Sequence, residues 1–144
     1  TGVNALLAGF EAQLELKLTK EIEFSSSLSY TYGEIKNTSS PLPQIPPMKG
    51  ESSITFTSGK FSLGVNSEYA AAQNRLDDFE QRTAGYVIFG AFGQYTISTG
   101  KFIHNLSINA ENLTDRIYYN HLSRIKSILP EPGINLRMTY KLLY

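Results

Sequence analysis

Polar and apolar residues alternate along most of this chain, and the pattern is clearest in residues 133–144. One face of this segment carries Ile134, Leu136, Met138, Tyr140, Leu142 and Tyr144. The other face carries Asn135, Arg137, Thr139 and Lys141, and Leu143 is its one apolar residue. A period of two residues predicts a β-strand, because successive side chains of a strand point to opposite faces. The strand ends on an aromatic residue that is also the last residue of the sequence.

Six further segments show the same alternation and predict strands. They are residues 7–18, 21–32, 50–58, 60–69, 83–98 and 102–112. The segment 83–98 is the least regular, because Tyr86, Ile88 and Phe92 interrupt its polar face. No segment has the 3.6-residue period of an amphipathic helix. The sequence therefore predicts an all-β, antiparallel chain of about seven strands.

The predicted connections alternate between short and long. Short turns fall at residues 19–21, 57–60 and 98–101, and long connections at residues 33–49, 70–82 and 113–132. Bacterial membrane barrels have this arrangement, with short periplasmic turns and longer extracellular loops. The last strand would then end on the periplasmic side. The segment 41–47 contains four prolines, which donate no ladder hydrogen bond, so we expect it to lead into a strand rather than lie within the sheet.

Aromatic residues gather towards both ends of the predicted strands. Phe24, Phe56, Phe61 and Phe102 lie near short turns, whereas Phe10, Tyr30, Tyr32, Tyr69 and Tyr86 lie towards the long connections. A transmembrane barrel has an aromatic girdle at each interface, whereas a soluble sandwich places aromatic residues in its core. The pattern favours an antiparallel transmembrane β-barrel segment. A small outer-membrane barrel or adhesin of about eight strands, and a soluble β-sandwich binding module, remain the alternatives.

Composition agrees with a membrane barrel and excludes other classes. Of the 144 residues, 18% are charged, and the formal net charge is zero. The zero net charge gives no field that would attract nucleic acid. The chain has no cysteine, which excludes disulfides and cysteine-ligated metals. No run of eighteen apolar residues predicts a membrane helix, but a spanning strand needs only about 9–11 residues. Because the first residues do not form a signal peptide, we expect a mature chain or a fragment.

Four motifs resemble a known family. They are residues 41–50, from Pro41 to Gly50; Ala72 to Leu76 with Glu80, Thr83, Gly85 and Tyr86; Glu111-Asn112-Leu113-Thr114-Asp115-Arg116-x-Tyr118; and Asn120 to Gly133. In this order they resemble the C-terminal part of a TonB-dependent outer-membrane receptor. The chain departs from the family pattern at Ile134, where arginine is common, and at Tyr144, where phenylalanine or tryptophan is usual.

The resemblance implies a larger protein than this chain. Such a receptor is a barrel of about 22 strands with a plugged lumen. Residues 1–144 would be its C-terminal barrel portion, without the plug and the earlier strands. The implied activity is active uptake of a scarce nutrient, a ferric siderophore or another metal complex, across the bacterial outer membrane. No catalysis and no cofactor are implied. The implied partners are outer-membrane lipid, the rest of the barrel and plug, TonB through the missing N-terminal part, and the barrel assembly machinery.

The resemblance also suggests where function lies in this chain. An anionic ferric siderophore would favour cationic and aromatic loop residues, and the candidates are Arg75, Arg82, Arg116, Tyr118, Tyr119, His121 and Arg124. For His121 the alternative is a hydrogen bond between loops. His104, on the apolar face, is expected at the membrane interface rather than on a metal, and no metal site is expected. The assembly signal is expected in Met138, Tyr140, Leu142 and Tyr144.

Overall fold

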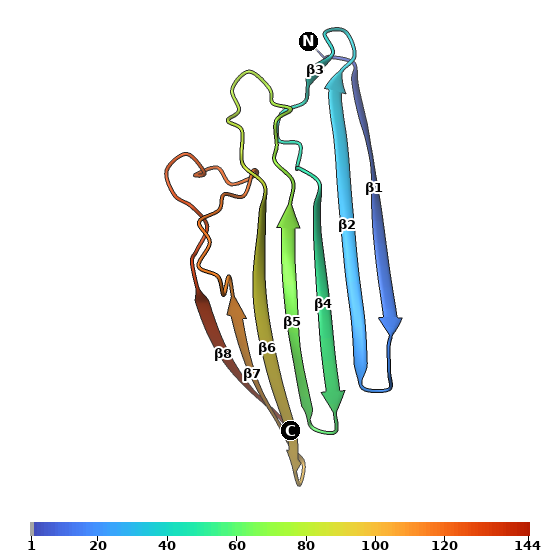
Figure 1. Cartoon of the computed structure of the whole chain (residues 1–144), viewed down its shortest axis with the longest axis vertical. Coiled ribbons are helices and arrows are strands. Elements are labelled where there is room, and N and C mark those ends of the chain that lie inside the picture. Colours follow the sequence, from blue (N-terminus) through green and yellow to red (C-terminus); the bar gives the residue numbers. More distant parts are fainter. Residues whose placement is uncertain (1) are drawn as a thin grey trace.

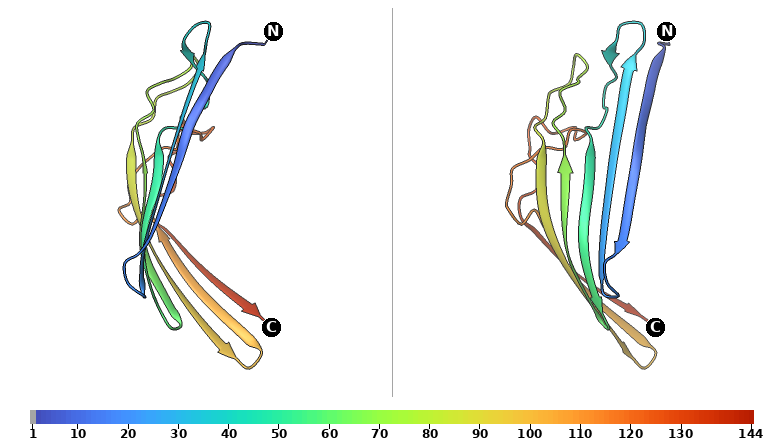
Figure 2. Two further views of the ribbon diagram at one scale, coloured as in Figure 1. Left: turned by 90° about the vertical axis from the view of Figure 1, so that its right-hand side faces the viewer. Right: turned by 45° about the vertical axis from the view of Figure 1, so that its right-hand side comes forward.

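The computed structural model describes residues 2–144, which form a single antiparallel sheet one layer thick. Figure 1 shows the strands side by side in chain order. The long strands are β1 (Ala5–Lys17), β2 (Ile22–Ile35), β4 (Lys49–Ser58), β5 (Phe61–Ala70), β6 (Tyr86–Thr99), β7 (Phe102–Glu111) and β8 (Asn135–Leu143). They confirm the seven predicted strands. The sheet twists and curves like a piece of a barrel wall (Figure 2). No helix in residues 2–144 is long and apolar enough to span a membrane.

An eighth strand, β3 (Ser40–Pro41), was not predicted. It pairs with the end of β2, with Glu34 opposite Pro41 and Ile35 opposite Ser40. Two residues are too few to show a period, which explains why the sequence pattern misses it. Pro41 is tolerated there because β3 lies at an edge, where no further strand needs its missing N–H.

The pairing register places most apolar residues of the seven long strands on one face. Phe10 lies opposite Tyr30, and Ile108 lies opposite Met138. We call this side the apolar face and the opposite side, with residues such as Gln94 and Ser107, the polar face. Large side chains of the apolar face are uncovered: Val65 is 57% exposed and Met138 is 69% exposed. Within residues 2–144 no second sheet covers this face, as a β-sandwich would require.

The turns β1–β2, β4–β5 and β6–β7 lie at one end of the sheet, together with Tyr144, and the long connections lie at the other (Figure 1). We call these the short-turn end and the long-loop end. Gly59 and Gly100 have φ angles of 57° and 61°, which favour glycine in the turns β4–β5 and β6–β7. The predicted alternation of short and long connections is confirmed.

The irregular polar face of β6 has a structural cause. Tyr86 and Ile88 are buried there, 6% and 8% exposed, and form a small core with Ala70. Tyr118, from the connection between β7 and β8, packs on this core. The strand begins at Tyr86, later than the predicted start at Thr83, because Thr83 forms only an isolated bridge with Gln73. The apolar residues that break the alternation therefore mark where a loop folds over the polar face.

Candidate functional site

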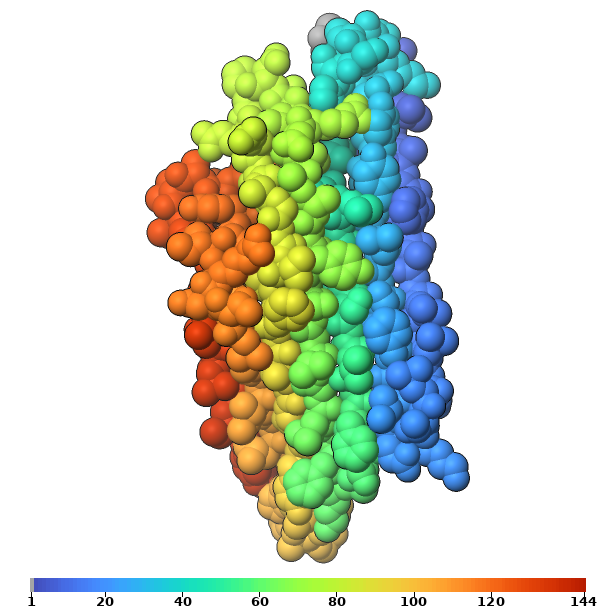
Figure 3. All heavy atoms as spheres, in the orientation of Figure 1, coloured from blue at the N-terminus to red at the C-terminus, as the bar shows by residue number. Residues whose placement is uncertain are grey.

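Three loops meet at the long-loop end, and their contacts define the candidate site. They are the first loop (residues 36–48), the second loop (71–85) and the third loop (112–134). The Gln44 N–H donates to Glu80 Oε1 at 2.7 Å, which joins the first and second loops. Gln73 Nε2 donates to the Ile45 carbonyl at 2.8 Å and adds a second link between them. Figure 3 shows the loops at the long-loop end, stepping down from the first loop (cyan) through the second (green) to the third (orange).

A depression of about 430 Å³ lies between these loops, and all three contribute to its lining. We call it the three-loop pocket. Its charged lining residues are Asp77, Glu80, Arg124 and Lys126. Phe79, also in its lining, is 95% exposed. An exposed aromatic ring beside charged groups of both signs can contact an apolar part and a polar part of a ligand at once.

His121 lies in the wall of this pocket and links the second and third loops. Its Nδ1 is 3.1 Å from Thr83 Oγ1, and its side chain is buried, with the residue 4% exposed. The Lys126 ammonium lies 3.3 Å from the same Nδ1 and donates to the His121 carbonyl at 2.8 Å. An ammonium only donates, so Nδ1 accepts and the imidazole is neutral, with its hydrogen on Nε2. His121 thus makes the loop–loop contact that the sequence allowed as an alternative to ligand binding.

The other ring nitrogen of His121 lacks a hydrogen-bond partner. Nε2 is buried without one among residues 2–144, and the nearest carboxylate oxygen, Glu80 Oε1, is 3.7 Å away. Burial and the Lys126 ammonium lower the pKa of His121, and Glu80 opposes them only in part. The neutral form is therefore the one that fits the closed loops.

This arrangement predicts that the loop contact weakens in acid. The folded-state pKa of His121 lies below its unfolded value of about 6.5. The stabilisation is therefore complete above that pH and is lost as pH falls through the lower folded-state pKa. Amide hydrogen exchange in residues 119–127 should accelerate between about pH 7.5 and pH 5, after correction for intrinsic exchange rates. The β6–β7 turn serves as an internal control, and His121→Gln should remove the pH dependence. Equal protection at both pH values would contradict this account.

The third loop is anchored by Asn112, which is 2% exposed. Its Nδ2 donates to the carbonyls of Arg116 and Pro132 at 2.9 and 3.1 Å, and its Oδ1 accepts from the Arg116 N–H at 2.9 Å. Asp115 Oδ1 accepts from the Ile134 N–H at 3.2 Å and closes the same loop. Asn112 and Asp115, from one motif, thus bind the two ends of the third loop together.

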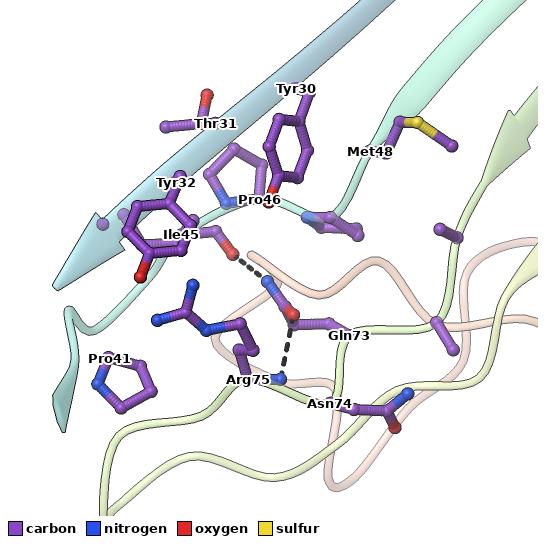
Figure 4. A pocket seen from close by; sticks show the side chains of 14 residues that line it. Tyr30, Thr31, Tyr32, Pro41, Ile45, Pro46, Met48, Gln73, Asn74 and Arg75 are labelled. Atoms are coloured by element: carbon purple, nitrogen blue, oxygen red, sulfur yellow. Dashed lines mark hydrogen bonds between the residues drawn. The ribbon is translucent and has the colours of Figure 1, made fainter. Parts of the chain in front are cut away.

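The predicted arginines do not gather at one point. Arg124 is exposed and lines the three-loop pocket. Arg82 and Arg116 are also exposed, and Arg116 Nη2 lies 3.5 Å from the Gly85 carbonyl. Arg75 lines a different pocket, where its guanidinium lies 4.0 Å above the Tyr32 ring (Figure 4). Of these four, only Arg124 belongs to the three-loop pocket.

The two predicted tyrosines differ in their surroundings. Tyr118 packs on Tyr86, with ring centroids 4.5 Å apart. Burial and the nearby Glu68 carboxylate raise the pKa of Tyr118, so its hydroxyl stays neutral. Tyr119 is exposed and its side chain lines a neighbouring depression. Tyr118 therefore serves packing, whereas Tyr119 is available for contact with a ligand.

Several residues of the site were not predicted from the sequence. Glu80 and Thr83 lie inside one of the quoted motifs, but neither was predicted as a site residue. Gln73 carries no local signal, because its partner Ile45 lies in another loop. Lys126 contacts His121, five residues earlier in the same loop, but no strand or helix pattern covers that segment. Within residues 2–144, no three metal-ligating side chains gather in one place.

The four residues expected in the assembly signal share the apolar face of β8 or continue it. Met138 pairs with Ile108, Tyr140 with Leu106, and Leu142 with His104. Tyr144 follows the strand and is 93% exposed. His104 Nδ1 lies 2.8 Å from the Tyr140 hydroxyl, so this histidine joins the aromatic residues near the short-turn end.

Comparison with known proteins decides the family. A model described as "TonB dependent receptor-like, beta-barrel" matches residues 4–113. The chain belongs to this family. A solved structure titled "Copper transporter OprC" matches 99% of the chain at 29% identity with a TM-score of 0.87. The ferric citrate transporter FecA, in its unliganded form, matches 96% of the chain at 21% identity with a TM-score of 0.79 and shows the same fold. The chain spans 24% of the length of each. A comparison with curated proteins gave no match.

Proposed function

We propose that residues 1–144 are the C-terminal barrel portion of a TonB-dependent receptor in a bacterial outer membrane. The intact receptor would have about 22 strands and a plug, and would import a scarce nutrient with energy delivered by TonB. Family membership supports this proposal, as do the matches to two transporters, each of which covers about a quarter of the transporter. The barrel assembly machinery would insert the chain, and lipid would surround its apolar face.

One observation carries the proposal. The register of seven strands leaves an apolar face uncovered and a polar face opposite it, while the loops gather at one end. In water such a face would be expected to be buried, because exposed apolar surface is unfavourable. In a bilayer the same face contacts lipid, and the polar face lines the lumen or meets the plug.

We propose a ferric siderophore or another metal complex as the substrate class. The titles of the two matching structures name copper and ferric citrate for those proteins. In this chain Arg124 and Lys126 bring positive charge to the three-loop pocket, and Phe79 offers an apolar surface. Arg82, Arg116 and Tyr119 are the further exposed candidates around the loops. An anionic metal chelate would complement these cationic groups, whereas Asp77 and Glu80 would face its polar or cationic part.

Uptake by cells that lack the full-length receptor tests the proposal. The deletion strain should fail to accumulate at least one labelled ferric or copper complex under limitation, and the intact gene should restore an accumulation that uncouplers abolish. Arg124→Gln should reduce that uptake, whereas Lys20→Gln, in the exposed turn after β1, should leave it unchanged. Normal accumulation of every such complex in the deletion strain would contradict the substrate class.

Tyr144→Asp should impair assembly of the full receptor. Tyr144 continues the aromatic end of β8 beside Tyr140, and a carboxylate there would have to leave water at the membrane interface. We expect a several-fold loss of receptor from the outer membrane, measured by immunoblotting of membrane fractions, and little loss for Tyr144→Phe. Normal levels of the Tyr144→Asp receptor would rule out the expected assembly role.

A further inference from the structure

The sheet has a notch where β2 extends beyond the end of its neighbour β4. The last pair of β2 with β4 is Ser29 with Lys49, yet β2 continues to Ile35. Extending the register would place Pro47 and Pro46 opposite Thr31 and Tyr32. Proline donates no ladder hydrogen bond, so the pairing stops and the first loop leaves the sheet. The wall is therefore interrupted beside the upper part of β2.

A pocket of about 270 Å³ occupies this notch (Figure 4). Tyr30, Pro46, Pro47 and Met48 form much of its apolar lining. Tyr30 lies opposite Phe10 on the apolar face, and Met48 precedes Lys49 of the polar face, so both belong to the apolar side. The notch thus opens along the face that we propose to contact lipid, close to the loops.

The opposite wall of the notch is held by hydrogen bonds. Buried Gln73 donates to the Ile45 carbonyl at 2.8 Å and accepts from the Arg75 N–H at 3.2 Å. These bonds fix the backbone of the second loop against the first, as Figure 4 shows. The position of Arg75 is therefore set by the fold before any ligand arrives.

Arg75 places a positively charged guanidinium in the lining of this apolar notch. Its guanidinium lies 4.0 Å above the Tyr32 ring, and its side chain is 43% exposed. Its Nη2 forms an ion pair with Glu34 Oε2 at 3.8 Å, a distance too long for a hydrogen bond. That carboxylate also accepts from the Tyr32 hydroxyl. In the described part of the chain, the planar donors of Arg75 therefore remain available to a phosphate.

We propose that the notch binds one anionic phospholipid from the surrounding membrane leaflet. Its acyl chain lies against Tyr30, Met48 and the prolines, and its phosphate accepts from Arg75. Tyr30 and Tyr32 lie towards the long-loop end of β2, where the aromatic girdle of a barrel protein would meet lipid head groups. This proposal rests on the proposed function, because only a membrane-embedded apolar face presents the notch to lipid.

Lipid binding to the delipidated full-length receptor in detergent tests the proposal by native mass spectrometry. The probes are phosphatidic acid, diacylglycerol with the same acyl chains, and inorganic phosphate. We expect phosphatidic acid to bind roughly tenfold more tightly than diacylglycerol, a ratio that one charge-assisted hydrogen bond can supply. Arg75→Gln should remove this preference and Arg75→Lys should keep part of it. Lys36→Gln, which removes an exposed charge outside the notch, should change nothing.

Met48→Ser provides a second, independent variant. Because Met48 contacts the acyl chain in the proposed complex, the change should weaken phosphatidic acid and diacylglycerol equally and leave their ratio intact. Equal binding of the two lipids by the unaltered receptor would overturn the proposal. Binding of inorganic phosphate as tight as that of phosphatidic acid would also overturn it and would indicate a plain anion site.

The lipid-binding measurement does not depend on nutrient uptake, so the lipid-site proposal and the transport proposal can fail separately. Loss of the phosphatidic acid preference in the Arg75→Gln receptor would support the lipid site. An unchanged preference in that variant would overturn the lipid site alone. Absence of the receptor from the outer membrane would overturn both proposals.

Discussion

Ile108→Arg is expected to destabilise the barrel in a bilayer by about 2–4 kcal/mol, the usual penalty for a cation on the lipid face near the midplane. Ile108 lies on the apolar face of β7 between Gly93 and Met138, and it is 42% exposed. No second layer of residues 2–144 covers this face, so a guanidinium there would have lipid as its neighbour. Of the single changes considered for the strands, this one should have the largest effect.

Ser107→Arg is the matched control. Ser107 is the preceding residue and points to the polar face, between Gln94 and Thr139. The same side chain there meets polar neighbours, so we expect a change within about 0.5 kcal/mol. The two variants differ by one position along the strand and by the face on which the arginine lies.

The comparison is made by refolding the full-length receptor into lipid vesicles over a urea series. Folded receptor is scored by its altered mobility on gels without heating. The urea midpoint should fall clearly for Ile108→Arg and remain near that of the unaltered receptor for Ser107→Arg. A larger loss for Ser107→Arg, or equal losses, would mean that the apolar face is not the lipid face.

The strands and their faces could be predicted because their signal is local. Period-two alternation in β8 fixes which residues share a face, and a slip of one residue would exchange the faces. The loop arrangement carries no such signal. Thr83 meets His121, and Gln73 meets Ile45, only because separate strands bring their loops together.

Departures from the pattern were the most informative positions in the sequence. Tyr86 and Ile88 break the alternation of β6 and prove to be buried under Tyr118. Phe92, the third departure, packs across Gly64 of β5, where a larger residue would collide with its ring. The predicted strand boundary at Thr83 was three residues early, since Thr83 serves the contact with His121 instead. Local rules fail here because contacts between distant segments outweigh them.

Asn112→Leu is the second change expected to have a large effect, and its effect should be confined to the third loop. Leucine leaves the carbonyls of Arg116 and Pro132 and the Arg116 N–H without their partner. Asn112 also has a φ angle of 49°, which asparagine tolerates far better than leucine. Together these effects should destabilise the closed third loop by about 3–5 kcal/mol.

Two further variants, Asn120→Leu and Asn112→Gly, separate the loss of hydrogen bonds from the backbone strain. Asn120 belongs to the same loop and is exposed, and its Oδ1 accepts only from the Leu122 N–H at 3.0 Å, so its replacement should change stability by less than about 1 kcal/mol. Glycine at position 112 keeps the backbone conformation but removes the hydrogen bonds, so its effect should be intermediate.

Hydrogen exchange and limited proteolysis of residues 113–133 should report the loss in the Asn112→Leu receptor. The pairing of β7 with β8 begins at Glu111 and Asn135, outside the loop, so receptor levels in the membrane should stay close to normal. A detached third loop also withdraws His121 from Thr83 and Arg124 from the three-loop pocket. Uptake should therefore fall while assembly survives. Unchanged protection in residues 113–133 would show that the Asn112 bonds do not hold the loop, and lost assembly would show that they support the sheet as well.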